Sequence, residues 1–140
     1  MKAYIAGKLR EKEEIEQLQK VEALCTSIGL DTFLPHRDVG LAESLKDVDK
    51  VFKGDIKEGF KDIKLVIALL DGFHVGAGTA WELGYAYAKG IPAIGLKTDE
   101  SIEDSLDYLS AIIIGSMPIA TSLSELRNKL LFFKENGRFN

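Results

Sequence analysis

Short apolar runs alternate with segments of helical periodicity along the chain, and this alternation limits the possible fold more than any other feature. Residues 65–70 form a continuous apolar run, which is typical of a parallel strand covered on both faces. Residues 15–28 instead carry apolar side chains at helical spacing, and Gly29 follows as a helix terminator. The pattern predicts successive βαβ units.

Five strands are expected, at residues 2–6, 32–34, 65–70, 93–96 and 112–114. Helices are expected between and after them, at about residues 15–28, 48–60, 79–89 and 123–133. A chain of 140 residues is long enough for one such domain, spanning residues 1–140. The sequence therefore predicts an α/β, flavodoxin-like, doubly wound five-stranded parallel sheet. Such sheets bind ligands at the carboxyl ends of the strands, beside the switch in strand order.

Composition disfavours several classes of partner. The formal net charge of −4 offers no general attraction to nucleic acid or to an anionic membrane. No apolar run is long enough to cross a bilayer or to form a signal-peptide core, so we expect a cytoplasmic protein. Cys25 has no cysteine to pair with, and with only His36 and His74 beside it we expect no metal site.

The segment from Asp71 to Gly90 is the richest in candidate chemistry. It runs from the end of the central strand through a glycine-containing loop, with Gly76 and Gly78, into a helix. Glycines let the backbone approach a ligand closely, and a helix start presents free N–H groups. The loop has neither the glycine spacing of a dinucleotide site nor the Lys-Ser/Thr ending of a nucleoside-triphosphate loop.

Glu82 allows two interpretations. Thr79 and Glu82 have the spacing of a capping box, in which the glutamate bonds back to the first turn of its helix. Alternatively, the helix dipole keeps Glu82 ionised beside the ring of Trp81, which could shelter a sugar or a base. An ionised, sheltered carboxylate suits a glycosyl-transfer nucleophile.

Three segments together resemble the nucleoside 2-deoxyribosyltransferase family: YIAG at the start, FLPHRD after the second strand, and GTAWELGYAYAKGIP preceded by ALLDG. The resemblance covers nearly the whole chain, and its most specific element is the WELGYA stretch with its following glycine and proline. It implies a flavodoxin-like enzyme that moves 2-deoxyribose between bases through a covalent glutamyl intermediate, without a cofactor. The family includes relatives that hydrolyse nucleoside 5′-monophosphates.

Carried over by position, the resemblance makes Glu82 the nucleophile and places Tyr4 beside it. Asp55 falls where the family has an aspartate that handles the departing base. The structural alternative for Tyr4 is a half-buried aromatic residue of the strand. The alternative for Asp55 is a solvated carboxylate on the helix surface. The family also lends an Asn-x-Met element to a neighbouring subunit, for which Ser110 and Ile112 are the nearest candidates here.

The first loop and the glycine-rich loop depart from the family pattern. Gly76 stands where the transferases carry an aspartate that holds the sugar hydroxyls, and Asp71 could substitute for it. After Gly7, the cations Lys8 and Arg10 could bind a 5′-phosphate. The alternative for these two cations is a solvated loop with helical ion pairs to neighbouring acidic residues, namely Glu11, Glu13 and Glu14. Two interpretations also exist for the charged turn 36–38 after the second strand: its side chains either face the ligand crevice or form hydrogen bonds and ion pairs with one another.

Three functions therefore remain open: transfer of 2-deoxyribose between bases or to water, hydrolysis of nucleoside 5′-monophosphates, and nucleotide binding with little turnover. Each implies a small nucleoside or nucleotide partner. The resemblance and the apolar run 112–114, followed by Met117 and Pro118, also predict a homo-oligomer with shared sites.

Overall fold

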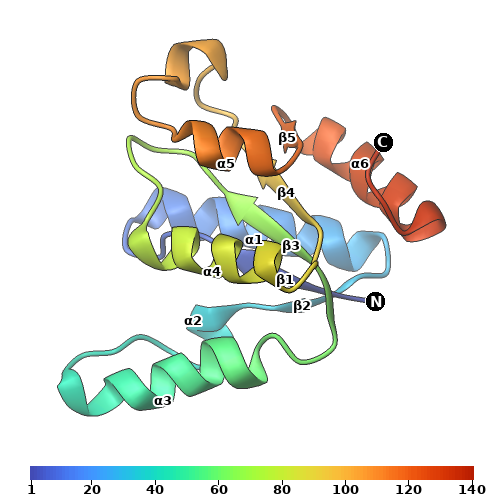
Figure 1. Ribbon diagram of the computed structural model, residues 1–140. Coiled ribbons are helices and arrows are strands. Elements are labelled where there is room, and N and C mark those ends of the chain that lie inside the picture. The colour runs from blue at the N-terminus through green and yellow to red at the C-terminus, as the bar shows by residue number, and fades with distance from the viewer.

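The computed structural model describes residues 1–140 and contains one sheet of five parallel strands in the order β2-β1-β3-β4-β5. The strands are β1 (Lys2–Ala6), β2 (Asp31–Phe33), β3 (Ile63–Leu69), β4 (Ala93–Leu96) and β5 (Ile119–Ala120). From β1 the chain first adds β2 on one side and then builds β3, β4 and β5 on the other (Figure 1). This order is the flavodoxin-like order with its switch between β1 and β3, so the predicted fold class is confirmed.

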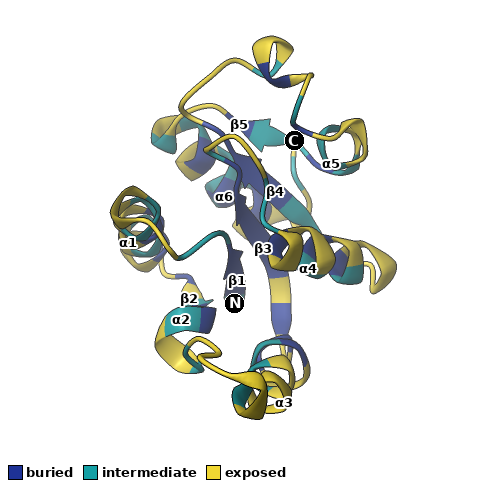
Figure 2. Cartoon of the chain, turned by 90° about the vertical axis from the view of Figure 1, so that its left-hand side faces the viewer, coloured by how far each residue is buried: buried dark blue, intermediate teal, exposed yellow.

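Two apolar layers cover the sheet, because successive side chains of each strand point to opposite faces. Helices α1 (Lys12–Ser27) and α6 (Leu123–Asn136) pack on one face against Ile5 and Ile67. Helix α4 (Ala77–Ala88) packs on the other face against Ala6 and Ala68. Figure 2 shows the buried colour concentrated on the strands, with α1 and α6 on one side of the sheet and α4 on the other.

The remaining elements are short helices: α2 (Pro35–Asp38), η1 (Leu45–Asp47), α3 (Val48–Phe52), η2 (Lys53–Glu58), η3 (Glu103–Ser105) and α5 (Ala111–Ser116). The predicted helix over residues 48–60 is thus divided, because η2 is a π-helical turn. Its wide geometry is visible in the bond from the Gly59 N–H to the Gly54 carbonyl, five residues back, at 2.8 Å. A Cβ at Gly59 would lie 2.6 Å from the Phe33 ring, so this turn packs tightly beside β2. Single π-turns of this kind are often found at functional sites.

The predicted fifth strand at residues 112–114 is wrong. These residues form α5, and β5 follows at Ile119–Ala120. The Ser110 hydroxyl accepts a hydrogen bond from the Ile112 N–H at 3.1 Å and so caps the helix start. A short apolar run does not distinguish a strand from a helix by its periodicity, and here the cap decides.

Candidate active site

Two strand ends approach closely at the switch point. Gly7 follows β1, and a Cβ there would lie 3.0 Å from the Leu69 Cβ at the end of β3. Glycine therefore lets the two carboxyl ends lie side by side with little room between them. The loop after β3 then leads through Gly76 and Gly78 into α4.

Tyr4 and Glu82 are joined by a hydrogen bond across this junction. Tyr4 lies in the middle of β1, is completely buried, and donates its hydroxyl proton to Glu82 Oε2. Its ring stacks on Phe60 at 4.3 Å and on Phe33 at 5.3 Å between centroids. Because packing against two aromatic rings fixes the tyrosine, its hydroxyl also fixes the position of the Glu82 carboxylate.

Asp55 brings a second carboxylate to the same cavity. It lies on the π-helical turn η2, and its Oδ1 atom is buried without a hydrogen-bond partner. Burial raises the pKa of Asp55 to about 6. A buried acceptor without a partner is costly, so its presence indicates a group that bonds to a ligand or carries a proton.

The Glu82 carboxyl is also shifted toward its protonated form. Burial raises its pKa to about 7; the Tyr4 hydrogen bond lowers it, and the negative charge of Asp55 raises it. The pKa of Tyr4 rises far above its usual value, chiefly through burial and then through Glu82, so the phenol stays a donor. Two coupled carboxyl groups that titrate near neutral pH can divide the roles of nucleophile and acid.

The expected capping box and the expected ionisation by the helix dipole are both wrong for Glu82. Helix α4 begins at Ala77 with Gly76 as its N-cap, so Thr79 is the third helical residue and Glu82 the sixth. At that depth the carboxylate cannot reach the cap, and the dipole effect has largely faded. Burial therefore dominates its pKa.

The cavity around these carboxylates has two lobes, which share six residues: Ala42, Val51, Asp55, Ala77, Gly78 and Glu82. The apolar lobe has a volume of about 460 Å³ and is otherwise lined by apolar side chains, among them Val48, Phe52, Ile56 and Trp81. The polar lobe has a volume of about 500 Å³ and includes Gly7, Lys8, Arg10, Gly76 and Thr79. Glu82 thus lies between an apolar region and a cationic one.

The aromatic wall of the apolar lobe is open to solvent at its outer edge. Phe52 and Trp81 meet edge to face at 5.8 Å between centroids, and they are 44% and 51% exposed. Trp81 was predicted from its place beside Glu82, but Phe52 was not. The only sequence signal for Phe52 was its place in the loosely apolar helix pattern of residues 48–60.

The cations of the polar lobe have no acidic partner. Neither Lys8 nor Arg10 forms an ion pair, so the alternative of helical ion pairs with the following glutamates is not found. Glu11 and Glu14 instead form the capping box of α1. The first turn of α4 faces the same lobe with no side-chain cap and no acidic residue. Free N–H groups and the unpaired Arg10 form a suitable environment for an anion. The stem of Lys8 lines the same lobe, and its ammonium lies beside Gly72 at the adjoining pocket, which is lined by acidic side chains, so a change of rotamer would bring it to the anion.

Two predicted substrate contacts lie elsewhere. The Asp71 carboxylate accepts hydrogen bonds from the Thr98 N–H at 2.6 Å and from the Gln17 side chain at 2.6 Å, so it joins the ends of β3 and β4 to α1. It therefore cannot substitute for a carboxylate at position 76. Ser110 caps α5 and lies in the groove between α4 and α5, outside the Glu82 cavity of this chain.

The charged turn after β2 supports the fold. Asp38 accepts hydrogen bonds from Arg37 and from the Leu34 N–H at 2.8 Å, and Arg37 also donates to the Thr32 carbonyl. None of residues 36–38 lines the cavity, although Pro35 at the start of α2 does. Arg37 and Asp38 thus bond to each other, and Arg37 also pairs with Glu22 of α1, so neither side chain faces the crevice.

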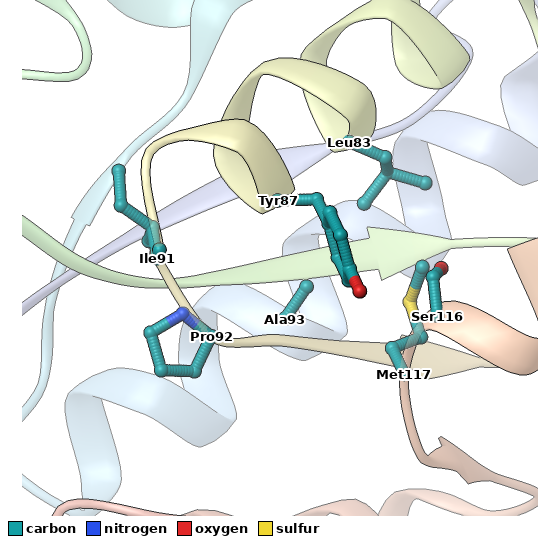
Figure 3. Close-up of a pocket in the computed structure, with 8 residues that line it drawn as sticks. Leu83, Tyr87, Ile91, Pro92, Ala93, Ser116 and Met117 are labelled. Carbon is teal, nitrogen blue, oxygen red and sulfur yellow. The ribbon is translucent and has the colours of Figure 1, made fainter.

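A separate apolar cavity of about 230 Å³ lies at the amino end of β4. Figure 3 shows its lining side chains from the end of α4, the start of β4 and the end of α5, including Leu83, Tyr87 and Met117. It contains no carboxylate and is at the opposite end of the strands from Glu82, so it does not belong to the candidate active site.

No group of three or more His, Cys, Asp or Glu side chains is arranged to hold a metal ion. None of the helices has the length and apolar character needed to cross a bilayer.

Comparison with known proteins gives a matching family model and several similar structures, of which three are described here. The family model described as nucleoside 2-deoxyribosyltransferase matches residues 3–111. A 2-deoxyribosyltransferase from Bacillus psychrosaccharolyticus is 25% identical with a TM-score of 0.75, over 91% of each chain. A conserved protein from Enterococcus faecalis V583 is 25% identical with a TM-score of 0.74, over 94% of this chain and 98% of that one. The CMP N-glycosidase BcmB from Clostridium botulinum shares the fold at 20% identity and a TM-score of 0.62, over 93% and 98%. No curated protein sequence matches.

Proposed function

The chain belongs to the nucleoside 2-deoxyribosyltransferase family, and on this premise we propose that it cleaves the N-glycosidic bond of a 2-deoxyribonucleoside and transfers the sugar to another base or to water. One observation carries the proposal: the cluster in which Glu82, bonded to Tyr4, shares a cavity with Asp55. A carboxylate nucleophile beside a second carboxyl group with a raised pKa is the arrangement that retaining glycosyl transfer needs.

In the first step the Glu82 carboxylate attacks C1′ of the sugar. A bond forms between a Glu82 oxygen and C1′, the bond from C1′ to the base nitrogen breaks, and its electron pair leaves with the base. The Glu82 and Asp55 carboxyls share one proton near neutral pH, and the reactive form is the one in which Glu82 is ionised and Asp55 holds that proton. Asp55 donates it to the departing base. The Tyr4 hydroxyl holds the carboxylate in position by its hydrogen bond.

In the second step a new acceptor attacks C1′ from the face that the base has left. The ester bond between C1′ and Glu82 breaks, and its electron pair restores the carboxylate. Asp55, now ionised, removes the proton of the incoming water or base. Two inversions at C1′ give overall retention. Glu82 and Asp55, which exchange the bonds and the protons, both line this cavity, and Tyr4 contacts Glu82 by its hydrogen bond.

The apolar lobe offers a place for the base. Its Phe52 and Trp81 rings provide apolar and stacking surface, and Asp55 also lines it. A base in this lobe would leave its glycosidic nitrogen near Asp55 and direct the sugar toward Glu82 and the polar lobe.

A covalent trap tests the nucleophile. A 2-deoxy-2-fluoro nucleoside slows hydrolysis of the sugar ester, so peptide mass spectrometry should find one added sugar on Glu82. The matched control is Glu82→Gln, which should gain no mass and show no turnover. A sugar on any other residue, or full activity in the Gln variant, would contradict the mechanism.

A second candidate function is N-glycosidic hydrolysis of nucleoside 5′-monophosphates. It is favoured by Lys8 and Arg10, which have no acidic partners and lie in the polar lobe with the uncapped start of α4. A 5′-phosphate in this lobe would leave C1′ within reach of Glu82. Adding free adenine separates the two functions, because a transferase then forms a new nucleoside and a hydrolase releases only free sugar or sugar phosphate. Tight binding of a nucleotide without any product would instead support the third function, nucleotide binding with little turnover.

We further propose that the chain forms a homo-oligomer through α4 and α5. The groove between these helices has a volume of about 690 Å³ and a partly apolar lining, and it exposes Tyr87 at 70% and Ile112 at 83%. Exposed apolar surface of this kind is typical of protein interfaces. Ser110 lies in the same groove, which would bring it to a subunit boundary.

A further inference from the structure

Thr79 has a hydroxyl group that the protein itself does not use. The residue is 4% exposed and lies one helical turn before Glu82 on the same face of α4. Its hydroxyl forms no hydrogen bond with any backbone or side-chain group. Threonines in helices commonly satisfy this group at a carbonyl one turn back, so the missing bond requires an explanation.

The hydroxyl is open to the polar lobe rather than sealed in the core. The only fully enclosed side-chain polar atoms without a partner are His36 Nδ1 and Asp55 Oδ1. Thr79 is not among them although it is a buried residue, and it lines the lobe with Lys8 and Glu82. The small exposed part of Thr79 therefore includes its oxygen, which faces the cavity.

The Thr79 hydroxyl lies close to Gly76, which has no side chain. The Thr79 Oγ1 atom lies 3.8 Å from the point that a Cβ on Gly76 would occupy. It is therefore the side-chain polar atom nearest to the position that a side chain at residue 76 would occupy.

The proposed place of the base sets the direction of the nucleoside. With the base in the apolar lobe beside Asp55, the sugar would extend past Glu82 into the polar lobe. A phosphate there is best bound by the cations and the free N–H groups of α4. A sugar hydroxyl, which both donates and accepts, is best matched by a neutral group of the same kind, and Thr79 is that group.

We propose that Thr79 is a specificity-determining residue whose hydroxyl binds the 3′-hydroxyl of the 2-deoxyribose. This inference rests on the proposed function. A site that bonds to a substrate hydroxyl disfavours the analogue without it, because a buried polar group is then left without a partner. The wild-type protein should therefore prefer 3′-hydroxy over 3′-deoxy substrates by about tenfold in kcat/KM.

The test measures kcat/KM for two substrate pairs, 2′-deoxyadenosine with 2′,3′-dideoxyadenosine and thymidine with 3′-deoxythymidine. Thr79→Val removes the hydroxyl at nearly constant volume and should abolish the tenfold preference, mainly by slowing the 3′-hydroxy substrates. Thr79→Ser keeps the hydroxyl and should keep the preference. If the valine variant does not fold, Thr79→Ala compared with Thr79→Ser provides the same contrast.

The outcomes separate this inference from the proposed function. Turnover of all four substrates with no 3′ preference in the wild type, or equal losses on both members of a pair in the valine variant, would overturn the role of Thr79 alone. If the wild type neither converts nor binds any of the four by calorimetry, the proposed function fails and the inference fails with it.

Discussion

Glu82→Gln should stabilise the folded protein at alkaline pH while it abolishes turnover. Burial raises the pKa of Glu82 from 4.5 to about 7. The folded chain therefore keeps a proton that the unfolded chain releases, and the free energy of unfolding of the wild type falls as pH rises from about 4.5 to 7. Above pH 7 the wild type carries the full cost of a buried charge, which a neutral glutamine avoids.

The size of the effect follows from the two pKa values. At 1.36 kcal/mol for each pKa unit, the difference between 4.5 and about 7 corresponds to about 3 kcal/mol. The glutamine oxygen can still accept the Tyr4 hydrogen bond, so that contact is kept. With an unfolding entropy of about 2.1 cal/mol/K per residue, a chain of 140 residues should melt about 10 °C higher at pH 8.5.

Urea unfolding of both proteins at pH 4 and pH 8.5 measures the effect. The two proteins should have similar free energies of unfolding at pH 4, where Glu82 is protonated in both states, and should differ by about 3 kcal/mol at pH 8.5. The matched control is Glu43→Gln, on an exposed loop, which should show no such pH dependence. A Gln variant no more stable than the wild type at pH 8.5 would refute the argument that Glu82 is held in a desolvated site.

Four further outcomes are expected. Neutralising Lys8 and Arg10 together should raise KM at least tenfold for 5′-monophosphates and leave KM for nucleosides nearly unchanged; equal effects on both would show a solvated loop. The profile of kcat/KM against pH should be bell-shaped: it should rise as the Glu82 and Asp55 pair loses its first proton near pH 6 and fall as the pair loses its second near pH 7. Asp55→Asn should remove the fall at alkaline pH. Gly76→Asp should keep or slightly raise the melting temperature, because residue 76 has φ −61° and is the N-cap of α4. The same variant should raise the rate of base exchange about tenfold. A stable variant with no gain in base exchange would count against a transferase-like sugar site. Sedimentation should show a concentration-dependent oligomer, and a monomer that is fully active when dilute would argue against shared sites.

Several features of the fold were predictable from local pattern because burial fixes them. The continuous run at residues 65–70 predicted a central strand, and residues 63–69 form β3 in the middle of the sheet. Helical spacing with a terminating glycine likewise predicted α1. Apolar periodicity reports which face of an element is buried, so it identifies long elements well. It identified α5 poorly, since three isoleucines suit a strand and a helix equally and the Ser110 cap decided between them.

The sequence by itself determined the parallel α/β class, the position of the glycine-rich loop and the candidate carboxylates at 55 and 82, because these follow from apolar pattern and from motif resemblance. Only the tertiary structure decided what those groups can do. The pKa of Glu82, the pairing of Asp71 with Gln17, the lack of partners for Lys8 and Arg10, and the free hydroxyl of Thr79 all depend on residues far apart in the chain. Burial and electrostatic environment are sums over such neighbours, and no local pattern contains them.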